Sequence, residues 1–219
     1  MFDNNSKDQT AAEAARAGAT VVRERRQGKG YVVQSMFREV DADVYVMVDG
    51  DGTYSAASVH DLIRPILTGE ADMVVGSRLH AGSRSDFRPL NRLGNRLFLV
   101  LMNAIFREQL TDLLSGFRAF SRRVVKGLPL SGGGFEVETE LTIKALHRGY
   151  RIVEVPIGLT ARPAGSHSKI RHFRDGIVII NTIFALFRDY KPLTFFGSAG
   201  LVLTRLRLRP TRLVREAER

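Results

Sequence analysis

One short stretch constrains the fold more than any other part of the chain. Residues 44–48 form an apolar, mostly β-branched run that leads directly into Asp49-Gly50-Asp51-Gly52-Thr53. Such a run, ended by turn residues, predicts an interior strand of an α/β sheet. Sheets of this class bind ligands at the carboxyl ends of their strands. We therefore expect Asp49 and Asp51 to lie at a binding edge.

The two carboxylates predict a metal site. Side chains two residues apart in an extended chain point the same way. Two carboxylates about 4 Å apart repel each other by about 4 kcal/mol at an effective dielectric constant of about 20. A divalent cation bound between Asp49 and Asp51 would remove this repulsion. Oxygen ligands favour Mg²⁺ or Mn²⁺, and water and substrate phosphates would complete the coordination.

Other interpretations of this stretch exist. Asp-Gly-Asp-Gly is also favourable turn chemistry. An EF-hand loop is excluded, because Tyr54 stands where that loop needs glycine and His60 where it needs a bidentate glutamate. A strand followed by Asp-x-Asp-Gly-Thr resembles the nucleophile motif of haloacid-dehalogenase-type phosphatases, although their downstream acidic pair does not appear. Such a phosphatase is therefore one alternative function.

Composition narrows the class of protein. A chain of 219 residues with 44% hydrophobic residues predicts one globular domain, with room for an appendage. The absence of cysteine excludes disulfides and thiolate metal sites. A net charge of +10 indicates anionic partners, which by charge alone include nucleic acid, a phosphorylated substrate and an anionic membrane surface.

Helices and strands alternate along the chain. We expect helices over residues 9–17, 31–39 and from the glycine loop 132–134 to residue 147. Strands are expected at residues 19–22, 44–48 and 72–76, with an extended segment at 115–120. This alternation predicts βαβ units and a mostly parallel sheet.

Several charged residues lie near the predicted strand ends. Arg78 follows the strand 72–76, Arg84 and Arg88 lie in the loop after it, and Arg92 and Arg96 lie on a later helix. Each arginine alone is typical of a solvated surface. Beside a metal site, however, the set predicts a binding surface for phosphates, because guanidinium binds phosphate in a bidentate manner.

The ordered set of motifs resembles the family 2 glycosyltransferases, most of all the polyprenyl-phosphate sugar transferases such as dolichyl-phosphate mannosyltransferases. The resemblance covers roughly residues 1–195. Its motifs are Asp3-Asn4-Asn5-Ser6-x-Asp8, Gly28-Lys29-Gly30, Asp49-Gly50-Asp51, Gly76-Ser77-Arg78, Asn91-Arg92, Ser115-Gly116-Phe117-Arg118, Phe135-Glu136-x-Glu138-Thr139-Glu140 and Gly165-Ser166-x-Ser168-Lys169.

This resemblance implies a GT-A fold and an inverting hexosyltransferase that uses a UDP- or GDP-sugar donor. The acceptor would be a polyprenyl phosphate, and nucleic acid would not be a partner. The implied roles are Mg²⁺ or Mn²⁺ binding by Asp51 with Asp49 assisting at the ribose or the metal, base or ribose binding by Asp3, donor binding by Lys29, diphosphate binding by Ser168 and Lys169, acceptor-phosphate binding by Arg78 and Arg92, and substrate contacts by Arg96, Arg118, Glu136 and Glu138. Acidic residues in a first helical turn are otherwise often only complements of the helix dipole. This alternative suits Glu140 better than Glu136 and Glu138, which follow a glycine loop.

The two ends of the chain depart from the family pattern. The family begins with a strand-helix-strand unit that is not seen before Asp3, so we expect a core over residues 1–165 with an incomplete donor pocket. Residues 166–219 are expected to form an amphipathic helix at 169–189, followed by an apolar run at 193–203 that Arg205 stops, as in a truncated anchor. The eleven residues 177–187 would span roughly 16 Å of a bilayer core of about 30 Å.

The tail is therefore expected to lie on a membrane, on its cytoplasmic face, and not to cross it. A further alternative is a catalytically inactive fragment that binds anionic membrane surfaces.

Overall fold

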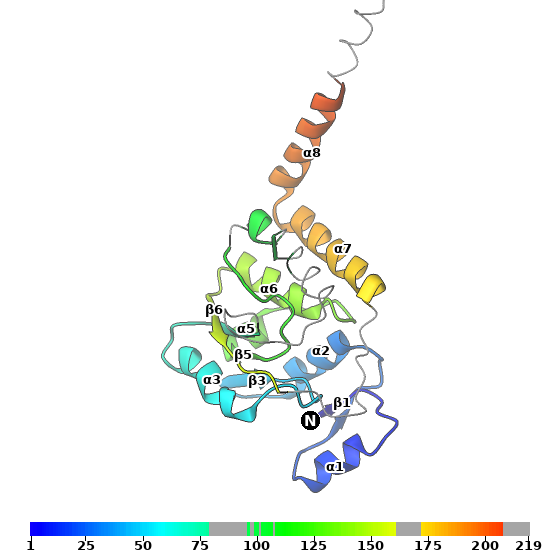
Figure 1. The fold of residues 1–219 in the computed structure, drawn as a ribbon, viewed down its shortest axis with the longest axis vertical. Coiled ribbons are helices and arrows are strands. Elements are labelled where there is room, and N and C mark those ends of the chain that lie inside the picture. The colour runs from blue at the N-terminus through cyan, green and yellow to red at the C-terminus, as the bar shows by residue number, and fades with distance from the viewer. Residues whose placement is uncertain (79–95, 97–98, 101, 107, 161–171, 208–219) are drawn as a thin grey trace, which may run out of the picture.

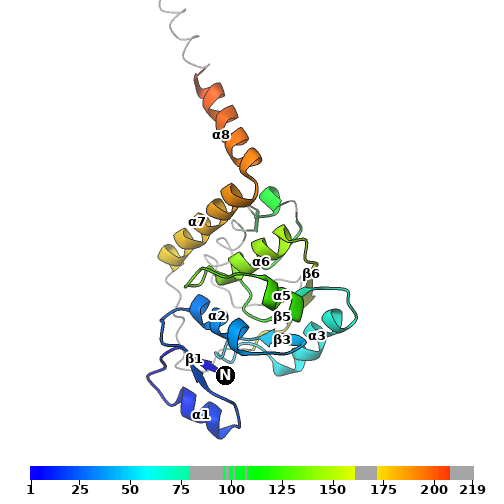
Figure 2. The same cartoon turned by 180° about the vertical axis from the view of Figure 1, so that it is seen from behind.

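The computed structural model describes residues 1–78, 96, 99–100, 102–106, 108–160 and 172–207. A sheet lies at the centre of the main body, with helices on both sides of it (Figure 1). Helix α8 projects away from this body, and α1 lies near the other end beside β1. The view from behind shows the same arrangement (Figure 2).

The main sheet has four strands in the order β3-β5-β4-β6. They are β3 (Val44–Met47), β4 (Met73–Ser77), β5 (Arg118–Ser121) and β6 (Ile152–Pro156). Strands β4 and β6 pair in parallel, and β5 pairs antiparallel with both β3 and β4. Three of these four strands therefore share one direction, which confirms the predicted α/β class with its mostly parallel sheet. A second, two-stranded parallel sheet joins β1 (Phe2–Asp3) to β2 (Val22–Arg23).

The reversed strand β5 has a consequence for the site. Its first residue, Arg118, pairs with Met47 near the carboxyl end of β3 and with Val75 of β4. The residues just before β5 therefore arrive at the edge where β3 and β4 end.

The described helices include α1 (Thr10–Arg16), α2 (Lys29–Glu39), α3 (Val59–Leu67) after the short 3-10 helix η1 (Ala56–Ser58), α5 (Arg122–Gly127), α6 (Val137–His147), α7 (His172–Tyr190) and α8 (Pro192–Arg207). Of these, α1, α2, α6 and α7 lie close to the predicted ranges. Gly18, with φ of +85°, follows the end of α1 in the left-handed region that glycine tolerates. The Ser55 hydroxyl accepts a hydrogen bond from the Ala57 amide, as expected for a capping residue.

Alternation along the strands divides the core into two layers. Phe120 and Met73 pack with Val33 of α2 and Leu141 of α6 on one face of the sheet. The neighbouring residues Ala119 and Val74 point the other way and pack against Leu62 of α3. Successive side chains of a strand face opposite sides, so burial on both faces requires apolar residues at every position.

Helix α7 packs against α6 through part of its apolar surface. The sequence pattern predicts that Ile177, Ile180, Phe184 and Phe187 face inward or toward lipid. In the structure Ile179, Ile183 and Phe187 are buried, whereas Ile177 and Phe184 are exposed. The same pattern includes Ile170, which lies outside the described residues, and Phe173, whose side chain is not described.

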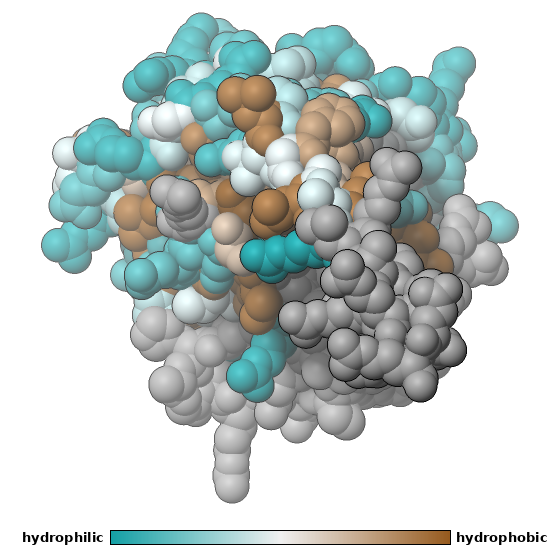
Figure 3. Space-filling model, turned by 90° about the horizontal axis from the view of Figure 1, so that it is seen from above, coloured by the Kyte–Doolittle hydropathy of each residue, from teal (hydrophilic) through white to brown (hydrophobic). Residues whose placement is uncertain are grey.

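Helix α8 exposes apolar side chains to solvent. Leu193 is 91% exposed, and Phe196, Leu201, Val202 and Leu203 are also exposed. Seen from the α8 end, hydrophobic residues interrupt an otherwise hydrophilic surface (Figure 3). None of the helices in the described part of the chain is long and apolar enough to cross a bilayer.

Candidate donor and metal site

The ammonium group of Lys29 contacts two carboxylates. One of them, Asp49, follows the carboxyl end of β3. The Nζ atom of Lys29 lies 2.6 Å from Oδ1 of Asp49 and 2.9 Å from Oδ2. On the other side Lys29 forms an ion pair with Glu138 of α6. The Asp49 side chain is 34% exposed, whereas that of Glu138 is only 4% exposed. Lys29 therefore lies between one accessible carboxylate and one buried carboxylate.

The environment keeps Lys29 charged. Burial alone would lower the pKa of its ammonium group, but the negative charges of Glu138 and Asp49 raise the pKa above its ordinary value. The position is set by α2, because Lys29 is the first residue of that helix and its side chain reaches the end of β3. A fixed positive charge thus stands at the predicted metal and diphosphate site.

Gly116 packs directly on this ion pair. A Cβ atom at Gly116 would lie 2.3 Å from Oδ2 of Asp49 and 2.8 Å from Nζ of Lys29. The Gly116 amide donates to the Tyr54 hydroxyl at 3.2 Å. The reversed entry into β5 therefore brings a residue without a side chain against Asp49, and only glycine permits so close an approach.

Asp51 lies in a turn that is tied to a distant segment. Its Oδ1 accepts hydrogen bonds from the Thr53 amide at 3.1 Å and from the Thr53 hydroxyl at 2.6 Å. The Thr160 amide donates to the Thr53 carbonyl oxygen at 3.0 Å, and the Thr160 hydroxyl donates to the Gly52 carbonyl oxygen at 2.8 Å. The Asp51 turn thus holds the residue that precedes segment 161–171, where the predicted diphosphate ligands Ser168 and Lys169 lie outside the described residues.

The glycine loop before α6 contacts the first turn of α2. A Cβ atom at Gly28 would lie 2.1 Å from the Gly133 carbonyl oxygen, and one at Gly30 would lie 2.1 Å from that of Gly132. The Gly30 amide donates to the Gly133 carbonyl oxygen at 3.1 Å. These glycines allow the two backbones to approach each other, and this approach sets the positions of Lys29 and Glu138.

Two further glutamates hold the same loop. Glu140 accepts hydrogen bonds from the amides of Ser131 and Gly132, both at 2.9 Å, and pairs with Lys144 at 2.6 Å. Burial would raise the pKa of Glu140, but these partners lower it below its ordinary value. Glu136 accepts from the Gly134 amide at 2.9 Å. The predicted substrate role of Glu136 stays a prediction, and the observed contact is with the loop.

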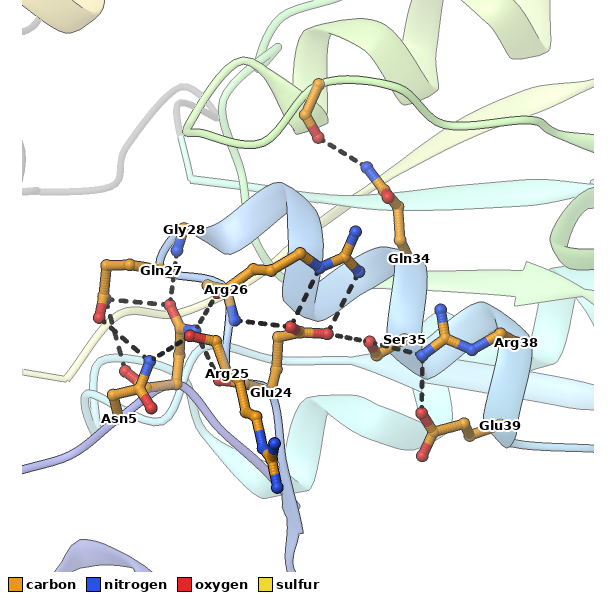
Figure 4. A network of polar contacts seen from close by, with 12 residues as sticks. Asn5, Glu24, Arg25, Arg26, Gln27, Gly28, Gln34, Ser35, Arg38 and Glu39 are labelled. Carbon is orange, nitrogen blue, oxygen red and sulfur yellow. Dashed lines mark hydrogen bonds and ion pairs between the residues drawn. The ribbon is translucent and has the colours of Figure 1, made fainter.

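A polar network joins the N-terminal motif to α2 (Figure 4). The side-chain oxygen of Asn4 accepts from the Gly28 amide at 2.8 Å, so the segment after β1 touches the start of α2. Glu24 accepts from the Arg26 guanidinium and amide and from the Ser35 hydroxyl, and these contacts lower its pKa to about 2.

Asp3 belongs to the same N-terminal segment. It is buried and accepts from the Ser6 amide at 3.2 Å. Its predicted contact with base or ribose stays a prediction.

Arg78 is held by an acidic residue that no motif had indicated. Its Nε and Nη2 atoms donate to the two carboxylate oxygens of Asp112 at 2.7 and 2.8 Å. The Asp112 side chain is 0% exposed, and its amide donates to Glu154 of β6 at 2.9 Å. Burial would lower the pKa of Arg78, but Asp112 raises it above its ordinary value. The guanidinium at the end of β4 is therefore fixed in orientation.

The substrate contact predicted for Arg118 stays a prediction, and its side chain is completely buried. It donates to the carbonyl oxygens of Ser115 and Leu113 at 2.8 and 2.6 Å and to the Thr142 hydroxyl at 2.9 Å. These contacts assign Arg118 to the support of the loop that carries Gly116. Arg96 is helical and exposed, and Arg92 lies outside the described residues.

The described residues suit a hard divalent cation. Asp49 and Asp51 offer only oxygen ligands, and the Asp49 side chain is 34% exposed. Among the described residues no group of three or more His, Cys, Asp or Glu side chains is placed to hold a metal.

Comparison with known proteins identifies the family. Residues 1–128 match the model of Glycosyl transferase family 2. The chain belongs to this family. Family membership confirms the resemblance seen in the motifs and favours a transferase over the phosphatase alternative.

Two curated relatives from Haloferax volcanii extend the comparison. Glycosyltransferase AglJ is 34% identical over 210 residues, which are 93% of this chain and 67% of AglJ. Dolichyl-phosphate hexose transferase is 31% identical over 180 residues, which are 82% of this chain and 77% of that protein.

A solved structure shares the fold. Glucosyl-3-phosphoglycerate synthase from Mycobacterium tuberculosis, in complex with Mn²⁺, uridine-diphosphate-glucose and phosphoglyceric acid, matches with a TM-score of 0.69 and 25% identity. The match covers 85% of this chain and 67% of that one.

The structure adds residues that sequence reasoning missed. Asp112 and Glu154 orient Arg78, and Tyr54 holds the loop at Gly116. Asp112 carries the one signal that could have been noticed, because it is a single acid between the leucines of residues 110–114.

Proposed function

We propose that this family 2 glycosyltransferase moves a hexosyl group from a nucleoside-diphosphate sugar, of the UDP-glucose or GDP-mannose type, to a polyprenyl phosphate with inversion. The observation that carries the proposal is the arrangement at the end of β3, where the Lys29 ammonium contacts Asp49 and where Asp51 follows in a hydrogen-bonded turn. Asp49 and Asp51 would hold the metal, and Lys29 would hold the diphosphate. The lipid-phosphate acceptor is supported by the similarity to dolichyl-phosphate hexose transferase.

The donor site needs groups that neutralise a diphosphate. A bound Mg²⁺ or Mn²⁺ would hold the diphosphate and stabilise it as a leaving group. Lys29 contributes a positive charge at the same place, and its pKa keeps it charged at neutral pH. Mn²⁺ and uridine-diphosphate-glucose in the related synthase support this assignment.

The acceptor requires orientation more than activation. A phosphate monoester is ionised at neutral pH, so its oxygen can attack the anomeric carbon without a general base. Arg78 would bind that phosphate, and the buried Asp112 would orient the guanidinium. Catalysis would then consist of charge neutralisation and alignment of the two reactants.

The lipid acceptor implies a membrane location, which we assign to the cytoplasmic face. Apolar residues are exposed along α8, and Leu201, Val202 and Leu203 are neighbours on successive sides of the helix. A protein partner would cover one side of such a helix, whereas lipid can surround it. Arg205 follows this run, and the chain carries a net charge of +10, both of which suit an anionic lipid surface.

The test compares Asp51→Asn with Asp61→Asn, which removes the same charge from an exposed position on α3. Calorimetry with Mn²⁺ and UDP-glucose or GDP-mannose would measure donor binding, and radiolabelled sugar transfer to undecaprenyl phosphate would measure activity. We expect metal-dependent donor binding and transfer in the wild type and in Asp61→Asn, and neither in Asp51→Asn. Equal affinity in all three proteins would contradict the metal assignment.

A further inference from the structure

The ammonium group of Lys29 contacts a carboxylate that is expected to bind a metal ion. It contacts both oxygens of Asp49, at 2.6 and 2.9 Å. A divalent cation that binds Asp49 must therefore displace Lys29 or lie close to it. Because like charges repel strongly at such distances, the metal and the ammonium compete for the same carboxylate.

The two partners of Lys29 differ in accessibility. Glu138 is almost completely buried, whereas Asp49 is about one third exposed. Separating Lys29 from Glu138 would leave a buried carboxylate without its cation, which is costly. Separating it from Asp49 leaves an accessible carboxylate that water or a cation can reach. Asp49 is therefore the contact that opens.

We infer that Lys29 is an internal counter-cation that couples metal binding to diphosphate binding. Without a diphosphate, Lys29 neutralises Asp49 and weakens metal binding there. When a diphosphate binds, Lys29 acquires a second anion while it keeps Glu138, and Asp49 becomes available to the metal. The inference rests on the proposed function, because it assumes that metal and diphosphate meet at Asp49.

Coupling of this kind is reciprocal and can be measured. If UDP raises the affinity for Mn²⁺ by some factor, Mn²⁺ raises the affinity for UDP by the same factor. Direct contact between metal and diphosphate produces part of this factor in any site of this type. The part that comes from Lys29 should disappear when the ammonium is removed, whereas a purely structural role of Lys29 would leave the factor unchanged.

The experiment measures Mn²⁺ affinity by calorimetry, with and without saturating UDP, in the wild type and in Lys29→Met. We expect Lys29→Met to bind Mn²⁺ alone about tenfold more tightly, because a positive charge next to Asp49 is lost. The enhancement of Mn²⁺ affinity by UDP should fall by about the same factor. Lys126→Met is the matched control, since it removes one charge from a lysine that contacts Asp41 and the Val40 carbonyl oxygen.

A second variant keeps the test valid if Lys29→Met folds poorly. Lys29→Met with Glu138→Gln removes both charges of the buried pair, so no buried carboxylate is left without a partner. Circular dichroism would confirm folding, and the same two expectations apply. Equal Mn²⁺ affinity and equal enhancement in the wild type and the folded variant would overturn the inference.

The outcomes also separate the two proposals. If the wild type binds Mn²⁺ with UDP and the enhancement is unchanged without Lys29, the inference fails and the proposed function stands. If none of the proteins binds Mn²⁺, with or without UDP, both the inference and the metal assignment fail.

Discussion

The edge of the sheet and helix α8 handle polarity in opposite ways. At the sheet edge the chain buries charged side chains such as Arg118, Asp112 and Glu138, each with specific partners. At α8 it exposes leucines and a phenylalanine. Buried charge fixes geometry, because unpaired charge in the interior is costly. Exposed apolar side chains add little to the stability of the fold, but they can contact lipid or the apolar surface of another protein.

The largest expected effect comes from the buried arginine. Arg118→Met should lower the free energy of unfolding by about 3–5 kcal/mol, because it leaves buried acceptors unpaired and removes a charge that balances Glu138 and Asp112. Chemical denaturation would measure this loss. Arg188→Met is the matched control, since Arg188 is 54% exposed and its ion pair with Asp189 lies at the surface, so a much smaller loss is expected. Similar losses in both variants would remove the structural distinction between the two arginines.

The fold class and the place of the site could be predicted from the sequence, and the reason is local. Residues 44–53 combine a strand pattern with turn chemistry, so the position of Asp49 and Asp51 after β3 follows from neighbouring residues alone. The partners of Arg118 could not be predicted in this way. They include Thr142, 24 residues later, and nothing near Arg118 shows that β5 runs antiparallel and places the side chain inside.

Helix α7 illustrates a different limit. Apolar residues lie on several of its sides, so periodicity alone does not decide which side packs. Contact with Ile143 of α6 selects Ile179 and Ile183 over Ile177 and Phe184. The register of a helix with a wide apolar surface depends on its neighbour, which the helix's own sequence does not encode.

Two helical glycines give the next test of the comparison. Gly30→Ala should destabilise the protein by about 1–3 kcal/mol, because the added methyl group would lie 2.1 Å from the Gly132 carbonyl oxygen. Gly200→Ala in α8 should not destabilise it, since nothing lies within 4 Å of the added atom. Alanine favours helix by about 0.5–1 kcal/mol over glycine at a position free of such contacts.

Thermal unfolding and far-ultraviolet circular dichroism would compare these two variants. A stable Gly30→Ala would show that the approach between α2 and the glycine loop is not required for the fold. A marked loss in Gly200→Ala would show that α8 packs against something other than solvent.

The smallest effect on stability should accompany a clear effect on lipid binding. Leu203 on α8 and Leu67 at the end of α3 are 67% and 68% exposed, so their replacement by serine changes the same kind of surface at two places. Both Leu203→Ser and Leu67→Ser should change the free energy of unfolding by less than about 0.5 kcal/mol. Burial of a leucine side chain in lipid is worth about 1.5–3 kcal/mol, so Leu203→Ser should weaken binding to vesicles that contain anionic lipid by about tenfold or more. Leu67→Ser should leave vesicle binding unchanged, because α3 lies on the main body away from α8 (Figure 1).

Co-sedimentation at low and moderate salt would measure both variants, and salt should weaken the binding of each protein through its basic residues. Equal binding by wild type and Leu203→Ser would show that α8 does not enter lipid. The exposed apolar residues of this helix would then have to be explained by a protein partner.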